Sequence, residues 1–297
     1  MKIYIPLLYS EKVKRPDKRY FLNNIIGEDF IILALSFSYF SSHPWLNVIG
    51  LFLLQMAFWC IYELGYIEND KIGEKFEDKA ILSYSYKSYE HSFGFWQPWL
   101  WSLCLSVLGL LVLAQDRINN TQIEDSLLLN GYNQSLFWFS QELVFWMLFL
   151  VVLRFLFYIY NSINKQSRVW FYLILQTCRY CGFLIVIATN TVGLMFLVSS
   201  IITRSIQYTL YRYLGGKNSS WPMDFPRYFF CLLIYLMLLT ILAVNDRDIY
   251  LLFNPQVLLI SAFCILRGGK HFYRVFAQFL PVSEDGSNKV TYSNSPK

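Results

Sequence analysis

A row of carboxylates follows a long apolar stretch near the start of the chain. Residues 58 to 79 read FWCIYELGYIENDKIGEKFEDK. If the helix of the apolar stretch continues, Glu63, Tyr66, Asp70 and Glu77 recur at steps of three, four and seven and lie on one face. A carboxylate near hydrocarbon costs roughly 2.5 to 3.5 kcal/mol on insertion scales, so we expect Glu63 to face protein or a water-filled cavity. This acidic row, meaning Glu63, Asp70 and Glu77, predicts a site for a cation.

The composition indicates a membrane protein. Of 297 residues, 56% are hydrophobic, 19% are aromatic and only 15% are charged, which is unlike a soluble domain. The net charge of +5 is spread over several segments, with no basic run interleaved with aromatics, so we expect no nucleic-acid partner. The six cysteines all lie in hydrophobic stretches and predict no disulfide framework.

Hydropathy predicts an all-α polytopic bundle with about eight membrane crossings. If there is a ninth helix, it is the short segment formed by residues 271 to 282. We expect one membrane domain over residues 1–297, with a leader at 1–26, helices from about 27 to 267, and a tail at 268–297. Residues 63 to 95 are expected to form a long loop. The predicted apolar cores of the crossings cover residues 30–40, 45–62, 96–114, 136–160, 169–187, 192–202, 229–244 and 249–266.

Basic residues give the orientation. Lysine and arginine crowd the leader and residues 161–168, 203–227 and 267–274, whereas the intervening loops carry only Arg117 and Arg247. The positive-inside rule therefore predicts that both termini and the acidic row are cytoplasmic.

Arginines inside the predicted helices are further candidates. Helix six continues so that Arg204, Tyr208 and Arg212 fall at four-residue steps on one stripe. Arg179 lies too deep in helix five to reach the headgroups, which favours a functional role. Glu63 either forms the wall of a site or pairs with an arginine such as Arg154 or Arg179.

The end of the second predicted helix resembles the UbiA superfamily of intramembrane prenyltransferases. The resemblance rests on Asn69, Asp70 and Glu77, which follow a leader containing Arg15-Pro16 and Asn23-Asn24. It implies a UbiA-like helical bundle in which Asp70 and Glu77, supported by Asn69, bind Mg²⁺ that grips a prenyl diphosphate, with Asp70 and Glu77 as catalytic residues.

The chain departs from this family at two places. Gly73 stands where the first motif has an acid. Residues 204 to 224 should hold a second aspartate-rich motif, but Asp224 is their only acid, and cations stand nearby instead: Arg204, Arg212, Lys217 and Arg227. Arginine can hold phosphate directly through two parallel hydrogen bonds, so we expect basic residues to replace the second metal site.

The resemblance implies transfer of a prenyl group from its diphosphate to an unidentified acceptor, in the plasma membrane or a bacterial inner membrane. A terpene cyclase of the same superfamily is one alternative. A lipid-binding protein, a transporter and a catalytically silent subunit are others, which the missing second motif favours. Membrane lipids are expected partners in each case. The expected substrate-binding residues are Asn69, Glu63, Tyr66, Arg179, Arg204, Tyr208 and Arg212.

Overall fold

The protein is helical throughout the part of the chain that the structure describes. The computed structural model describes residues 3–16, 18–39, 41–76, 82–88, 94–121, 128–164, 166–213 and 226–277; for helical residues 116–121, 128–137, 270, 271 and 274–277 it describes the backbone alone. The all-helical prediction is confirmed for these residues. In chain order the elements are η1 (Ser10–Lys14), η2 (Phe21–Phe30), α1 (Ile31–Phe37), α2 (Pro44–Phe76), α3 (Tyr84–Ser88), α4 (Gln97–Thr121), α5 (Leu128–Ser162), α6 (Arg168–Cys181), η3 (Gly182–Ile185), α7 (Thr191–Tyr213), α8 (Arg227–Asn245), η5 (Ile249–Phe253) and α9 (Pro255–Ala277).

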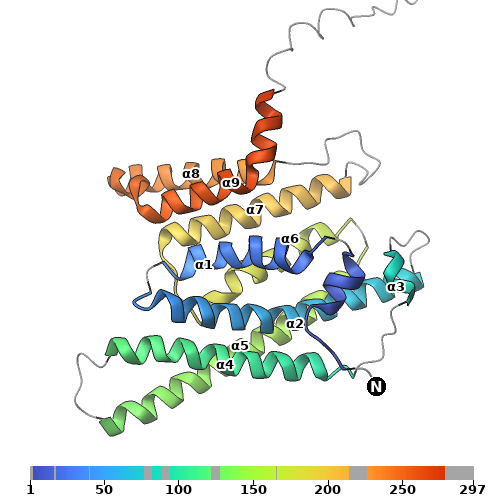
Figure 1. Cartoon of the computed structure of the whole chain (residues 1–297), viewed down its shortest axis with the longest axis horizontal. Helices are drawn as coiled ribbons and strands as arrows, with labels where there is room; N and C mark the ends of the chain where they lie inside the picture. The colour runs from blue at the N-terminus through green and yellow to red at the C-terminus, as the bar shows by residue number, and fades with distance from the viewer. Residues whose placement is uncertain are drawn as a thin grey trace, which may run out of the picture.

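The long helices lie side by side in a stack (Figure 1). α8 and α9 form one edge, followed by α7, by α1 with α6, and by α2, while α4 and α5 form the opposite edge. In this stack α2 packs on α4 and α5, α5 on α6, α6 on α7, and α7 on both α1 and α8. Three of these six pairs, α5 with α6, α6 with α7 and α7 with α8, are consecutive along the chain, as short connections favour.

Helix α2 is the best-buried long helix. Its apolar residues point in all directions, which is the pattern of a helix surrounded by others. It begins with Pro44, whose missing N–H is harmless in the first turn. Glycine allows close contact with α4, because a Cβ at Gly50 would lie 3.0 Å from the carbonyl oxygen of Gly109. α2 therefore forms the centre against which the other helices are positioned.

Among the described residues, four helices are long and apolar enough to cross a membrane: α2, α4 over Gln97–Gln115, α5 over Trp138–Ser162, and α8. The apolar part of α9, Pro255–Gly269, is shorter. These helices support a membrane protein. The full set of eight crossings stays a prediction, because α1 has only seven residues and α6 fourteen.

Several predicted boundaries need correction. The loop expected at residues 63–95 is wrong over two stretches. Residues 63–76 belong to α2, and residues 84–88 form the short helix α3. Helix η2 starts at Phe21, inside the predicted leader. The last helix starts at Pro255, not at residue 249, and extends beyond residue 267. Polar residues do not end a helix when other protein segments cover them, which explains the longer α2.

Candidate functional site

Two carboxylates lie buried in the second helical segment. Glu28 and Asp29 lie in the last turn of the π-helix η2, and only 1% of Asp29 is exposed. π-Helical turns are rare and are frequent at functional sites. Here both consecutive acids point into protein. Such a pair is costly unless cations and hydrogen bonds surround it.

Four arginines, each from a different helix, surround this pair. On Asp29, Oδ2 accepts hydrogen bonds from Nε of Arg179, at 3.0 Å, and from its Nη2, and Oδ1 accepts from Arg204 at 2.8 Å. On Glu28, Oε2 accepts from Arg204 at 3.0 Å and from Arg227 at 2.6 Å. Arg267 of α9 lies 3.3 Å from the other oxygen of Glu28. We call Glu28, Asp29 and these four arginines the arginine cluster.

Aromatic rings pack against the guanidinium groups. Arg179 lies 4.7 Å from the ring centroid of Trp59, and Arg227 lies 4.6 Å from that of Tyr228. The hydroxyl of Tyr180 donates to Asp29 at 2.9 Å, and its ring lies under Arg204 at 5.4 Å. Cation–π contacts are stronger where water is excluded, so the rings stabilise the buried cations.

The cluster carries more positive than negative charge. Among the described residues, four guanidinium groups face two carboxylates, which leaves an excess of two positive charges. Exposure rises from 5% for the side chain of Arg179, through 17% for Arg227, to 34% for Arg267. The cluster thus extends from the interior of the stack towards its surface.

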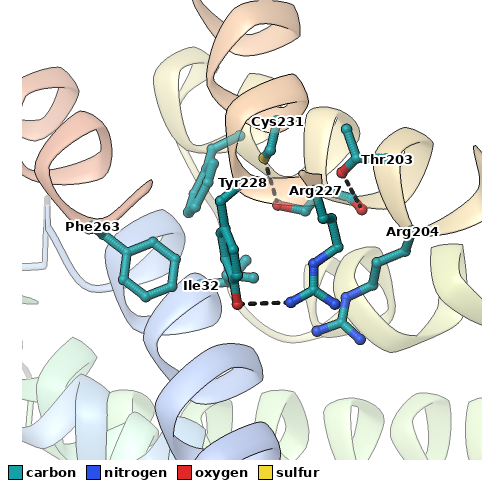
Figure 2. Close-up of a pocket in the computed structure, with 9 residues that line it drawn as sticks. Ile32, Thr203, Arg204, Arg227, Tyr228, Cys231 and Phe263 are labelled. Carbon is teal, nitrogen blue, oxygen red and sulfur yellow. Dashed lines mark hydrogen bonds between the residues drawn. The ribbon is translucent and has the colours of Figure 1, made fainter. Parts of the chain in front are cut away.

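A small cavity lies beside the cluster. Figure 2 shows the guanidinium groups of Arg204 and Arg227 lying next to each other at its edge, with Arg227 bonded to the hydroxyl of Tyr228. Ser200 and Thr203 add hydroxyl groups, and Phe263 is part of the apolar wall. The volume of about 10 Å³ is the room that one water molecule needs. A larger ligand would have to displace side chains here.

The acidic row has different partners from those expected. Glu63 accepts hydrogen bonds from the hydroxyl of Tyr4 at 2.7 Å and from the backbone N–H groups of Leu7, at 3.0 Å, and Ser10, at 2.7 Å. Its predicted pairing with Arg154 or Arg179 is therefore wrong. Burial and the nearby carboxylate of Glu63 raise the pKa of the Tyr4 hydroxyl well above its usual value, so Tyr4 stays a donor.

Asp70 is held by two side chains of the leader. Its Oδ2 accepts from the hydroxyl of Tyr9 at 2.6 Å, and its Oδ1 forms an ion pair with Lys14. Tyr66 shares the face of Asp70, as predicted, and lies 5.7 Å from the Lys14 ammonium. Glu77 lies outside the described residues, as do Lys217 and Asp224.

The stripe on α7 divides between two places. Arg204 joins the arginine cluster, whereas Arg212 donates to the hydroxyl of Tyr208 at 2.8 Å, which in turn lies 2.8 Å from the hydroxyl of Tyr160. The ring of Tyr208 stacks on Tyr172 at 3.9 Å. Arg204, Tyr208 and Arg212 thus follow one helical stripe without forming one site. Arg179 lies in the interior, as its sequence position indicated.

The described residues do not fit the Mg²⁺ site that the resemblance implies. Both oxygens of Asp70 and both oxygens of Glu63 already accept hydrogen bonds from the leader. No group of three potential metal-ligating side chains occurs within the described residues. Asn69 was the remaining ligand of the implied Mg²⁺ site, and no described contact joins its side chain to Asp70.

Sequence reasoning missed the centre of the site. Glu28 and Asp29 were not singled out from the sequence, although the cost of a carboxylate near hydrocarbon applies to them as it does to Glu63. Arg227 was expected among the basic residues that hold phosphate, and Arg267 was counted only as part of the basic segment 267–274. Their partners lie 199 and 239 positions away, which no local pattern reveals.

No protein-family model, no curated protein and no solved structure matches this chain.

Proposed function

We propose that this chain is an integral membrane protein of about eight crossings that binds the phosphate-bearing head of an isoprenoid lipid at the arginine cluster. The supporting observation is the excess of two guanidinium groups over carboxylates in a mostly buried site. Buried uncompensated charge is costly, so the excess favours an anion. Phosphate suits it, because arginine binds phosphate oxygens through two parallel hydrogen bonds.

The most specific version of this proposal is that the ligand is a prenyl diphosphate and that the protein is a UbiA-like prenyltransferase. The allylic carbon–oxygen bond would break, and pyrophosphate would leave with the electron pair. Arginines stabilise charge that develops on such a leaving group. The allylic cation would be captured by an acceptor, or by a double bond of its own chain in a cyclase. Aromatic faces can stabilise such a cation, but those of Trp59 and Tyr228 already lie against the guanidinium groups of Arg179 and Arg227.

The acidic row contributes no step to this proposal. The resemblance implies Mg²⁺ at Asp70, but both carboxylate oxygens of that residue have protein partners. The arginine cluster alone therefore carries the binding argument.

Contacts between distant segments support the proposed orientation. Near the carboxyl end of α2, Asn161 of α5 donates to the carbonyl of Gly65 at 3.2 Å. The leader also contacts this part of α2, and Arg267 contacts the backbone of Asn23. Several basic segments thus lie towards one end of the stack, which the positive-inside rule assigns to the cytoplasm.

A titration of the protein in lipid nanodiscs with a farnesyl-type diphosphate tests the proposal. Arg227→Gln should weaken binding by about tenfold or more, since a hydrogen bond to a charged group contributes about 1.5 to 3 kcal/mol. Arg154→Gln is the matched control, because Arg154 forms a two-bond ion pair with Glu68 outside the cluster. Equal affinity of the Arg227→Gln and unmodified proteins would refute the proposed site.

Binding or transport without chemistry is the second candidate. The occupied Asp70 favours it, because the metal-assisted step that the resemblance implies would first require the leader to move. Release of pyrophosphate from the bound diphosphate, measured with candidate acceptors and without them, separates the two. Binding without release over many hours would favour the non-catalytic protein.

A further inference from the structure

The two described members of the acidic row are covered by the chain's own leader. Residues 4–14 fold against the end of α2, where Tyr9, Val13 and Tyr86 pack with Ile67 in a small separate apolar cluster. The polar contacts in this region connect residues 53 to 61 positions apart. The segment is therefore bound by tertiary contacts and does not simply extend from the first helix.

A turn at Leu7 arranges the donors around Glu63. Leu7 has φ of 67°, in the left-handed region that side chains seldom adopt. Beyond this turn, the N–H of Ser10 reaches Oε1 of Glu63, while the N–H of Leu7 and the hydroxyl of Tyr4 reach Oε2. These three donors give both carboxylate oxygens of Glu63 hydrogen-bond partners without a metal. Such an unfavourable backbone conformation persists only where surrounding contacts hold it, as the hydrogen bonds to Glu63 do here.

Lys14 supplies the cation at Asp70. Its ammonium pairs with one oxygen, Tyr9 donates to the other, and the Lys14 side chain is only 22% exposed. A divalent ion at Asp70 would have to displace this ammonium.

We infer that Glu63 and Asp70 are the docking site of residues 4–14, with Lys14 as the cation at Asp70, and that these two carboxylates do not hold a divalent metal. The inference does not depend on what the arginine cluster binds. It has a consequence for that cluster, because the same segment continues to η2: Glu11 accepts from the N–H of Phe21 at 2.6 Å. Docking at Glu63 and Asp70 thus helps to position Glu28 and Asp29.

Hydrogen–deuterium exchange of the full chain in lipid nanodiscs tests the docking. In the unmodified protein, peptides covering residues 4–14 should be protected. Asp70→Asn should accelerate their exchange by about tenfold or more, because it removes the ion pair with Lys14. Glu68→Gln is the matched control: Glu68 lies two residues before Asp70 on α2 and accepts hydrogen bonds from Arg154 and Asn161 of α5, not from the leader. It should leave exchange of residues 4–14 unchanged.

A second variant distinguishes release of the leader from general misfolding of the Asp70→Asn protein. Lys14→Met breaks the same pair from the leader side, where a partly exposed residue is replaced. It should also release residues 4–14 while exchange in α5 and α8 stays unchanged. Unchanged protection in Lys14→Met and in a folded Asp70→Asn protein would overturn the inference. So would faster leader exchange in the unmodified protein on addition of MgCl₂ alone, since this would show a metal competing for Asp70.

Discussion

Asp29 is the residue on which most of the buried polar network depends. It accepts from Arg179, Tyr180 and Arg204, which come from two helices. Glu28 beside it reaches two more helices through Arg227 and Arg267. Two adjacent carboxylates therefore connect η2 to α6, α7, α8 and α9, and the excess positive charge around them defines the proposed anion site.

Replacing Asp29 by asparagine should destabilise the protein strongly. The change preserves volume but leaves Arg179 buried without its anion, and breaking a buried pair in this way costs about 3 to 5 kcal/mol. Thermal unfolding in a fixed detergent should show a clear decrease in melting temperature.

The control for this prediction is Glu68→Gln. Glu68 pairs with Arg154, but 23% of its side chain is exposed, so its loss should matter less. Equal melting temperatures for Asp29→Asn and the unmodified protein would contradict the account of the cluster.

At the level of elements, the π-helix η2 and the helix α2 hold the site from two sides. η2 presents both acids to the arginines, and α2 places Trp59 and Tyr62 against Arg179. The position of α2 depends on close packing with α5, where a Cβ at Gly65 would overlap the ring of Phe157. Gly65 is thus required by space and not by backbone conformation.

Gly65→Ala should therefore destabilise the bundle by about 1 to 3 kcal/mol, the usual cost of overpacking. Gly269→Ala is its control, because a Cβ at Gly269 of α9 meets nothing within 4 Å and alanine favours helix. Chemical or thermal unfolding of the two variants should show a loss for the first and no loss for the second. A stable Gly65→Ala protein would mean that α2 and α5 are packed differently.

At the level of the whole molecule, the sequence predicted the elements better than their partners. Apolar stretches located α2, α4, α5 and α8, because hydropathy is a local property. The end of α2 was misplaced, because Glu63 and Asp70 are covered by residues more than fifty positions earlier. Arg179 was recognised from its depth, but its partner Asp29 lies 150 positions away. A pattern of 3.6 residues per turn also does not predict the π-helix η2, in which the adjacent acids Glu28 and Asp29 are both buried.

The proposed orientation makes a prediction for labelling from the two sides of the membrane. A cysteine at Ser85 of α3 should react with a membrane-impermeant maleimide from the cytoplasmic side. A cysteine at the exposed Asp246, between α8 and η5, should react from the opposite side. Labelling of both positions from the same side would contradict the proposed arrangement of crossings.

The most direct measurement for the central claim is native mass spectrometry of the protein released from its own membrane. The unmodified protein should carry a bound mass that corresponds to a phosphate-bearing isoprenoid lipid. The Arg154→Gln protein should retain this mass, and the Arg227→Gln protein should lose it wholly or for the most part. Adding inorganic phosphate to protein without bound lipid distinguishes a site for a free anion from a site for a lipid headgroup. A site for a lipid headgroup should bind the phosphate-bearing lipid in preference to inorganic phosphate, because the lipid also contacts the apolar surroundings. If the unmodified protein carries no phosphate-bearing molecule and binds none from a mixture of prenyl diphosphates and polyprenyl phosphates, the arginine cluster is a structural network and the proposed function is wrong.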